Sequence, residues 1–180
     1  MVILVLSALL VSAAFEPIGI WCLALFGYAL FFNRLSKSRR PVLASFIFGA
    51  ILNGIVLHWS SKYVGALPWL LLTFLQAAFY LPVGWVYRKT SSLRWVVLTF
   101  LLCEELRARF PFGGFAWTRI AFSQVDSPLL PLVSIGGVLL LSFATLLSAL
   151  ALLRLKVRAL VLIVLSFLIV TFLPNNPSST

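Results

Sequence analysis

The sequence contains very few charged residues. Only 10% of its 180 residues are charged, whereas 62% are hydrophobic, and the mean hydropathy is +1.11. Soluble globular domains carry about 25% charged residues, so this composition excludes an ordinary water-soluble domain. It predicts an integral membrane protein, with no second, soluble domain marked by a change in composition.

Acidic residues are the scarcest of the charged residues. The sequence has four Asp and Glu residues but 14 Lys and Arg residues, which gives a formal net charge of +10. In a soluble protein such an excess of basic residues would favour binding to nucleic acid. Here the basic residues fall at the ends of apolar runs, where membrane topology accounts for them. We therefore predict no nucleic-acid partner.

Cysteine and histidine are also rare. Cys22 and Cys103 lie inside apolar runs without CxxC or Cys/His spacing, and His58 is the one histidine. This excludes the usual zinc and redox motifs. We expect Cys103 and His58 to be structural, and we predict no catalytic residue, no metal and no cofactor in this chain. The first apolar run is not preceded by a positive charge, so no cleaved signal peptide is expected.

What the chain has in abundance is long apolar runs. Only helices or closed barrels satisfy the backbone inside a bilayer, and these runs lack the alternation of barrel strands. The predicted fold is therefore all-α, a polytopic membrane bundle of about seven transmembrane helices in a single domain, residues 1–180. The predicted spans are 2–15, 17–33, 41–57, 67–87, 93–107, 129–153 and 157–173.

The first two predicted spans are short. At about 1.5 Å per residue, a helix of 14 residues reaches roughly 21 Å, against a hydrocarbon core of roughly 30 Å. The segment FEPIG, residues 15–19, is typical of a turn, since Pro17 suits a helix start. Two arrangements stay open: a tilted or re-entrant hairpin, or one kinked span over 1–33.

The basic residues predict the orientation. Residues 34–40, 88–94 and 154–158 carry four, three and three Lys or Arg. With seven spans these segments share one side, which the positive-inside rule places in the cytoplasm. The N-terminus is then cytoplasmic and the C-terminus extracytoplasmic. The other side receives every acidic residue of the chain: Glu16, Glu104, Glu105 and Asp126.

The outward-facing segment after residue 103 contains two possible ion pairs. Glu104 and Arg107 are three residues apart, and Glu105 and Arg109 are four apart. These spacings place each acid beside a base on one helical face. One interpretation is a self-neutralising cap at the membrane interface, because unpaired charges are costly at that depth.

An unusual loop follows this helix end. Pro111 ends the helix, and Gly113 and Gly114 supply a permissive backbone. Aromatic residues flank the glycines, as expected for a loop in the headgroup zone. These residues are Phe112, Phe115 and Trp117.

Residues 104–137, EELRARFPFGGFAWTRIAFSQVDSPLLPLVSIGG, resemble the membrane segment of the apolipoprotein N-acyltransferase family. That family has Glu-x-x-Arg at a span end, Gly-Phe-Pro-Trp, an aromatic residue with Ser-Gln, a Pro-Leu turn and a later Gly. This sequence departs from the pattern at Ala116, where proline is usual, and at Phe122, where tyrosine is usual. The turn FEPIG and Trp59 are also similar to the family, so the resemblance covers nearly the whole chain. The matching residues are Glu104, Arg107, Gly114, Phe115, Trp117, Phe122, Ser123, Gln124, Pro128 and Gly136.

The resemblance implies an enzyme of the bacterial plasma membrane. That family moves an acyl chain from a phospholipid to the α-amine of the diacylglyceryl cysteine of a lipoprotein, through a thioester. The nucleophilic Cys, with a Glu base and a Lys, belongs to a nitrilase-like domain. We expect this domain to be absent from the chain, so that the chain alone is not a self-sufficient enzyme. Its expected partners are membrane phospholipid, lipoprotein precursors and a separately encoded nitrilase-like domain.

The resemblance and the residue types also suggest roles within the outward segment. Arg107 or Arg119 would hold a lipid phosphate, because a guanidinium suits phosphate oxygens. The loop residues Gly114, Phe115 and Trp117 would contact the acyl chains. Structural roles are expected for Glu104, Gly113, Gln124 and Pro128.

Two other functions remain open. The chain could be a non-catalytic anchor or scaffold for a polyprenol-phosphate mannose synthase, a glycosyltransferase of the cytoplasmic face. Neutralising Arg88, Lys89 and Arg94 would then impair recruitment. A small transporter is the third possibility, although the predicted spans are nearly free of the ionisable groups that transporters use.

Overall fold

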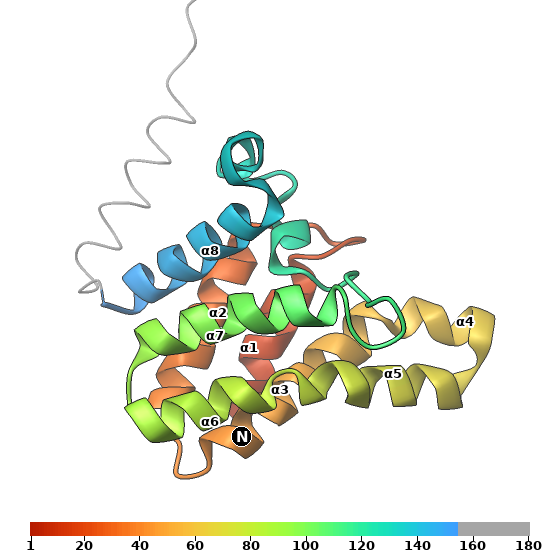
Figure 1. The fold of residues 1–180 in the computed structure, drawn as a ribbon, viewed down its shortest axis with the longest axis horizontal. Helices are drawn as coiled ribbons and strands as arrows, with labels where there is room; N and C mark the ends of the chain where they lie inside the picture. The colour runs from red at the N-terminus through yellow and green to blue at the C-terminus, as the bar shows by residue number, and fades with distance from the viewer. Residues whose placement is uncertain (155–180) are drawn as a thin grey trace, which may run out of the picture.

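The computed structural model describes residues 1–154, and every regular element in that range is helical (Figure 1). This confirms the predicted all-α class. The predicted span 157–173 lies outside the described residues. The α-helices are α1 (Val2–Ala13), α2 (Cys22–Ser36), α3 (Pro41–Val56), α4 (Ser61–Val64), α5 (Ala66–Ala78), α6 (Leu81–Thr90), α7 (Leu93–Arg107) and α8 (Val133–Arg154), and the 3₁₀ helices are η1 (His58–Ser60), η2 (Ile120–Gln124) and η3 (Leu130–Leu132).

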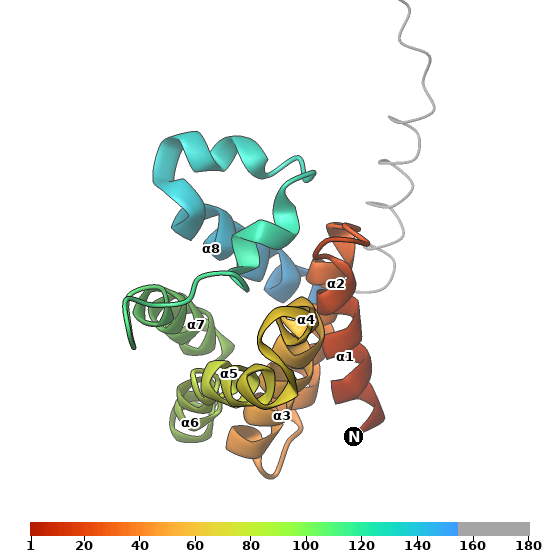
Figure 2. The ribbon, with the colours of Figure 1, turned by 90° about the vertical axis from the view of Figure 1, so that its right-hand side faces the viewer.

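The first two helices form a tightly packed hairpin. Helices α1 and α2 lie side by side in both ribbon views (Figures 1 and 2). Gly27 of α2 allows this approach, because a Cβ there would lie only 2.9 Å from the carbonyl oxygen of Ser7 and 2.5 Å from Cγ2 of Val11. Of the two arrangements left open for residues 1–33, the structure has the hairpin.

Helix α2 begins five residues later than the predicted span 17–33, at Cys22. The chain uses residues 14–21 for the turn between α1 and α2. Gly19 has φ of +69° there, a left-handed conformation that glycine adopts at little cost. Pro17, which was expected to start the second helix, therefore lies in the turn before α2.

The predicted span 67–87 consists of two consecutive helices, α5 and α6, which meet at residues 79–80. Pro82 stands in the first turn of α6. A proline ring clashes with the carbonyl four residues earlier, which belongs to Ala78, the last residue of α5. The break therefore has a local chemical cause that an apolar run does not reveal.

Helix α8 is interrupted near its start. Gly136 and Gly137 have non-helical conformations, with φ and ψ of −140° and 22° and of 63° and −167°. Figure 2 shows the chain changing direction before the rest of α8 continues. The predicted span 129–153 is thus bent at the two glycines, since glycine allows the positive φ of residue 137.

Length and composition identify few of the described helices as full membrane spans. Residues 66–90 and 130–154 are long and apolar enough to cross a bilayer, and α3 with η1 and α4 forms a third candidate bent by 51°. Helices α1 and α2 are shorter apolar helices. Helix α7 begins and ends where the sequence predicted, at 93 and 107. The total of seven spans stays a prediction.

Aromatic side chains fill the centre of the bundle. Phe31 of α2 packs against Phe48 of α3, with ring centroids 4.3 Å apart, and edge-on against Phe100 of α7 at 5.8 Å. Tyr80, just before α6, meets Phe100 edge-on at 5.5 Å. Each such pair adds about 0.5–1.5 kcal/mol beyond its buried area. This cluster joins α2, α3, α7 and the junction of α5 with α6.

The hairpin contact at Gly27 can be tested by matched alanine substitutions. We expect Gly27→Ala to lower the free energy of unfolding by about 1–3 kcal/mol, because the new methyl group overlaps the backbone of α1. Gly54→Ala is the control, since its Cβ would meet only Cγ2 of Thr73 at 3.6 Å. Thermal unfolding in detergent measures both variants. Equal unfolding midpoints would contradict the close packing of α1 on α2.

Candidate functional site

An ion pair is buried at the C-terminal end of α7. Nη2 of Arg107 lies 3.3 Å from Oε1 of Glu104, and the two side chains are only 2% and 4% exposed. The spacing of three residues predicted this pair, and the structure confirms it. The pair is buried inside the bundle and is not a solvent-exposed cap, and its position at the membrane interface stays a prediction.

Arg107 reaches across to a residue eleven positions later in the chain. Its Nη1 donates to Oγ1 of Thr118 at 2.6 Å, and its Nη2 donates to the backbone oxygen of Thr118. The hydroxyl of Thr118 in turn donates to Oδ1 of Asn53 on α3, at 2.8 Å. Asn53 completes the chain of bonds by donating to the carbonyl of Gly49 at 2.7 Å. The network therefore ties α7, the following loop and α3 together.

Glu104 accepts a second hydrogen bond, from the first residue of η2. The backbone N–H of Ile120 donates to Oε1 of Glu104 at 2.6 Å. Together with Thr118, this contact secures the far end of the loop on α7. The loop of residues 108–119 is thus held at both ends, once by its continuity with α7 and once by the buried charges.

The loop folds back closely over the end of α7. The N–H of Phe115 donates to the carbonyl of Arg107 at 2.7 Å, and a Cβ at Gly114 would lie 2.2 Å from the carbonyl oxygen of Ala108. Gly114 also has φ of +89°, so it must be glycine for both steric and conformational reasons. Gly113 has φ of +90°, but a Cβ at this position would have no neighbouring atom within 4 Å, so only its conformation requires glycine.

A second, more exposed charge cluster surrounds Glu105. Its Oε2 lies 3.2 Å from Nη2 of Arg109, whose side chain is 80% exposed. Its other oxygen accepts from Arg119, which is much less exposed. The predicted pair of Glu105 and Arg109 is therefore confirmed as an exposed ion pair. Arg119 joins it from the far end of the loop.

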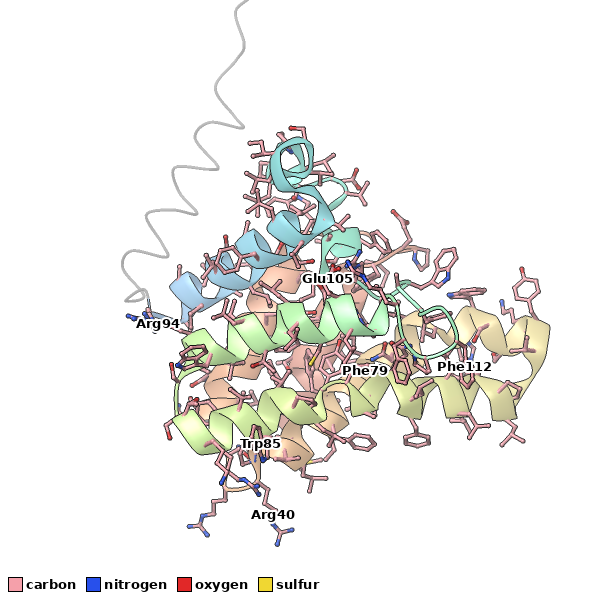
Figure 3. The ribbon with its side chains drawn as sticks, in the orientation of Figure 1. Arg40, Phe79, Trp85, Arg94, Glu105 and Phe112 are labelled. Atoms are coloured by element: carbon pink, nitrogen blue, oxygen red, sulfur yellow. The ribbon has the colours of Figure 1, made fainter. Side chains whose placement is uncertain are left out.

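Aromatic side chains project from this part of the surface. Trp117 is 61% exposed and meets Trp59 edge-on at 5.8 Å, and Trp59 meets Tyr63 at 6.2 Å. We call Trp59, Tyr63 and Trp117 the aromatic shelf. Phe112, at the tip of the loop, is fully exposed and lies beyond the end of α7 (Figure 3).

The segment that follows the loop also contacts the turn between α1 and α2. Nε2 of Gln124, in η2, donates to the carbonyl of Trp21 at 3.1 Å. Beside this contact is a cavity of about 100 Å³, lined by Glu16 and Asp126 among others. The two turns that carry the remaining acids therefore lie together. Pro128 is exposed at the turn that precedes η3.

Sequence reasoning missed Thr118 as the partner of Arg107, and Asn53 as the partner of Thr118. Asn53 interrupts the apolar run of α3 and is fully buried, and an isolated polar residue in a predicted span is a signal for an internal partner. Thr118 offered no such signal, because it lies in a loop rich in polar and aromatic residues. Only the folded chain brings it to Arg107.

Cys103 and His58 occupy positions with different surroundings. Cys103 is buried and lines a cavity of about 10 Å³ with Glu104 and Arg107, room for about one water molecule. His58 is exposed and packs edge-on against Trp69 at 5.2 Å. Within residues 1–154, no three His, Cys, Asp or Glu side chains are grouped as metal ligands would be.

Comparisons with known proteins agree on one family. A family model, the apolipoprotein N-acyltransferase N-terminal domain, matches residues 7–151. Apolipoprotein N-acyltransferase of Pseudomonas putida is 31% identical over 157 residues, which cover 76% of this chain and 31% of that protein. The enzyme of Mycolicibacterium smegmatis is 35% identical over 140 residues, covering 73% of this chain and 23% of that protein. The chain thus spans less than a third of the length of these curated relatives, and the match includes the whole loop and its buried network.

The buried and exposed ion pairs at the end of α7 should differ sharply in their effect on stability. We expect Arg107→Gln to lower the free energy of unfolding by about 3–5 kcal/mol, because Glu104 would remain buried without a cation. Arg109→Gln is the matched control and should cost less than about 1 kcal/mol, since its side chain is solvated.

Denaturant unfolding of both variants in the same detergent measures the difference. A loss for Arg107→Gln no larger than that for Arg109→Gln would show that the network around Thr118 does not hold the loop.

Proposed function

Because the chain belongs to the apolipoprotein N-acyltransferase family, we propose that it is the membrane domain of an enzyme that acylates the N-terminus of bacterial lipoproteins. Phospholipid would be the acyl donor. The observation that carries this proposal is the loop of residues 108–119, which the buried pair of Glu104 and Arg107 holds against α7 while its aromatic side chains project outward. A rigidly held apolar surface of this kind suits contact with lipid chains.

In this proposal the aromatic shelf and Phe112 contact acyl chains of the lipid substrates. Trp117 and Trp59 offer rings at a polar boundary, where tryptophan is favoured in membranes. Phe115 and Gly114 act less directly, by returning the loop over α7. The shelf would shelter the chains during transfer.

The two arginines considered for a lipid phosphate have different roles in the proposal. All the hydrogen bonds of the Arg107 side chain go to Glu104 and Thr118, and the side chain is 2% exposed. It is therefore assigned the role of positioning the loop. Arg119 is nearer the surface and beside Glu105, so it is the candidate for binding phosphate oxygens through its guanidinium.

The chemistry itself would belong to a nitrilase-like domain, as the family resemblance implies. Its cysteine thiolate would attack the phospholipid ester, which forms a thioester and releases a lysophospholipid. The free α-amine of the lipoprotein cysteine would then attack the thioester, which forms the amide and regenerates the thiol. The present chain would bring both lipid substrates to that domain.

The proposed location is the bacterial plasma membrane, with the basic segments in the cytoplasm. Arg94 at the start of α7 and Phe112 beyond its end lie at opposite ends of the molecule (Figure 3). This separation supports placing the basic connections on one side of the bilayer and the aromatic loop on the other, where the positive-inside rule makes the basic side cytoplasmic.

Cysteine labelling tests this orientation. In a chain with Cys22→Ala and Cys103→Ala, we expect Arg109→Cys to react with a membrane-impermeant maleimide in intact bacterial spheroplasts, and Lys37→Cys to react only after lysis. Both positions are exposed in the folded chain, so only the membrane should distinguish them. The reverse pattern would contradict the proposed orientation.

A chimaera tests the function. The chain would replace the matching region of the Pseudomonas putida enzyme in cells depleted of their own apolipoprotein N-acyltransferase. Mass spectrometry of a lipoprotein then measures the N-acylated fraction. We expect the chimaera to acylate the lipoprotein, and Trp117→Ala to reduce the rate roughly tenfold, which corresponds to a loss of about 1.4 kcal/mol of contact energy.

The matched control is Trp95→Ala. Trp95 is 58% exposed, almost as much as Trp117, but it lies at the opposite end of α7. Absence of acylation by the unsubstituted chimaera, with the intact Pseudomonas enzyme active, would contradict the proposed function. Equal losses from the two substitutions would contradict the role given to the aromatic loop.

A further inference from the structure

A basic groove lies where α6 packs against the start of α3. Arg39, Arg40 and Arg88 line it together with apolar residues that include Leu43 and Phe46, and its volume is about 350 Å³. Arg40 lies at the edge of the molecule, away from Phe112 (Figure 3). The groove is therefore distinct from the aromatic loop and from the proposed site of acyl transfer.

Gly84 allows α6 to approach the start of α3 closely at this groove. A Cβ at Gly84 would lie 2.4 Å from the carbonyl oxygen of Pro41, so α6 touches the first turn of α3 at this point. Arg88 is one helical turn after Gly84 and shares its face of α6. The close approach therefore brings Arg88 beside the two arginines that precede α3.

The chain itself offers no acidic side chain to these arginines. Its four acids are Glu16, Glu104, Glu105 and Asp126. Glu104 and Glu105 pair with arginines near the C-terminal end of α7. Glu16 and Asp126 line the cavity beside the turn between α1 and α2. Within residues 1–154, none is in ion-pair distance of Arg39, Arg40 or Arg88. Three positive charges that share a groove therefore require an anion from outside the chain.

The start of α3 adds to the attraction for an anion. The first amide groups of a helix have no partner within the helix, and the helix dipole makes this end positive. Helix α3 has 16 residues and begins at Pro41, which itself lines the groove. Anions, phosphate groups in particular, bind readily at such positions.

The groove continues into an apolar one. A neighbouring groove of about 440 Å³ shares Val42 and Leu81 with the basic groove and is otherwise lined by Ala78, Pro82 and Trp85. Trp85 is half exposed, as is typical of a tryptophan at the headgroup boundary. A ligand that fills both grooves must have a charged head and an apolar chain.

We propose that Arg39, Arg40 and Arg88 bind the phosphate of an anionic phospholipid, whose acyl chain lies along Val42, Leu81 and Trp85. Guanidinium groups suit phosphate oxygens because they present paired N–H donors. A net-anionic lipid is favoured over a zwitterionic one, since three positive charges meet in the groove. The site holds a structural lipid and does not depend on the function proposed for the aromatic loop.

Lipid binding to the purified full chain tests this site. The chain would be delipidated in a neutral detergent and titrated with phosphatidylglycerol, phosphatidylcholine or inorganic phosphate, with native mass spectrometry and thermal unfolding as measurements. We expect phosphatidylglycerol to bind and to raise the unfolding midpoint. Phosphatidylcholine and inorganic phosphate at the same concentrations should have much smaller effects.

Charge variants locate the headgroup. Arg88→Gln should weaken phosphatidylglycerol binding about fivefold, and the combined change with Arg39→Gln and Arg40→Gln about a hundredfold, as expected from ~1 kcal/mol per basic residue near an anionic lipid. Lys89→Gln is the matched control, because it removes a neighbouring charge that does not line the groove. It should leave binding unchanged.

A variant of the apolar groove separates a lipid from a simple anion. Ala78→Trp fills the groove without changing any charge, so it should weaken binding of phosphatidylglycerol and leave that of phosphate unaltered. Equal binding of phosphatidylglycerol and phosphatidylcholine would overturn the proposal, as would stabilisation by phosphate alone. Equal losses from Lys89→Gln and Arg88→Gln would also overturn it, because they would indicate general surface attraction. Thermal unfolding without lipid confirms that each variant is folded.

Discussion

The buried pair of Glu104 and Arg107 is the interaction on which the aromatic end of this domain depends. Removing two charges from water costs several kcal/mol per ion, and only good geometry with additional hydrogen bonds offsets that cost. The partners come from outside α7: the hydroxyl and carbonyl of Thr118 and the amide of Ile120. The charges are therefore satisfied only when the loop of residues 108–119 has returned to α7. The position of Trp117 in the aromatic shelf follows from that requirement, since Trp117 immediately precedes Thr118.

The small number of acidic residues organises the rest of the molecule. Two acids neutralise arginines at the end of α7, and the other two lie together beside the turn between α1 and α2. Every other basic side chain in the described residues must find its anion in solvent or in the membrane. One end of the bundle is consequently balanced in charge and rich in exposed aromatic rings, whereas the connection before α3 and the end of α6 keep a positive charge. The difference in charge between the two ends therefore follows from the small number of acidic residues.

Sequence patterns predicted the features that depend on neighbours along the chain. The apolar run of α7 predicted both of its ends, and the spacing of Glu104 and Arg107 predicted their contact. The breaks were missed because hydropathy averages over them: Pro82 separates α5 from α6, and Gly137 bends α8, in runs that stay apolar throughout. The contact of Thr118 with Asn53 joins residues 65 positions apart. No local pattern specifies such a pair, which forms only when the loop after α7 returns to α3. The burial of Arg107, and hence its role in positioning the loop, could not be predicted from the sequence for the same reason.

The buried charges serve to specify the conformation of the loop more than to stabilise α7. An apolar pair at positions 104 and 107 would avoid the cost of desolvation, and such replacements are often neutral or stabilising in buried ion pairs. That replacement would leave the amide of Ile120 and the carbonyl of Thr118 without their present partners, and the hydroxyl of Thr118 with only Asn53. The loop could then settle elsewhere on the apolar surface, because its remaining ties to α7 are the bond from Phe115 to the backbone of residue 107 and the more exposed charges around Glu105. In a bilayer, where apolar packing does little to distinguish one loop position from another, directional bonds to a fixed charge provide that distinction. The ion pair therefore fixes the position of the loop that carries Trp117 and Phe112, which an apolar pair of similar stability would leave unspecified.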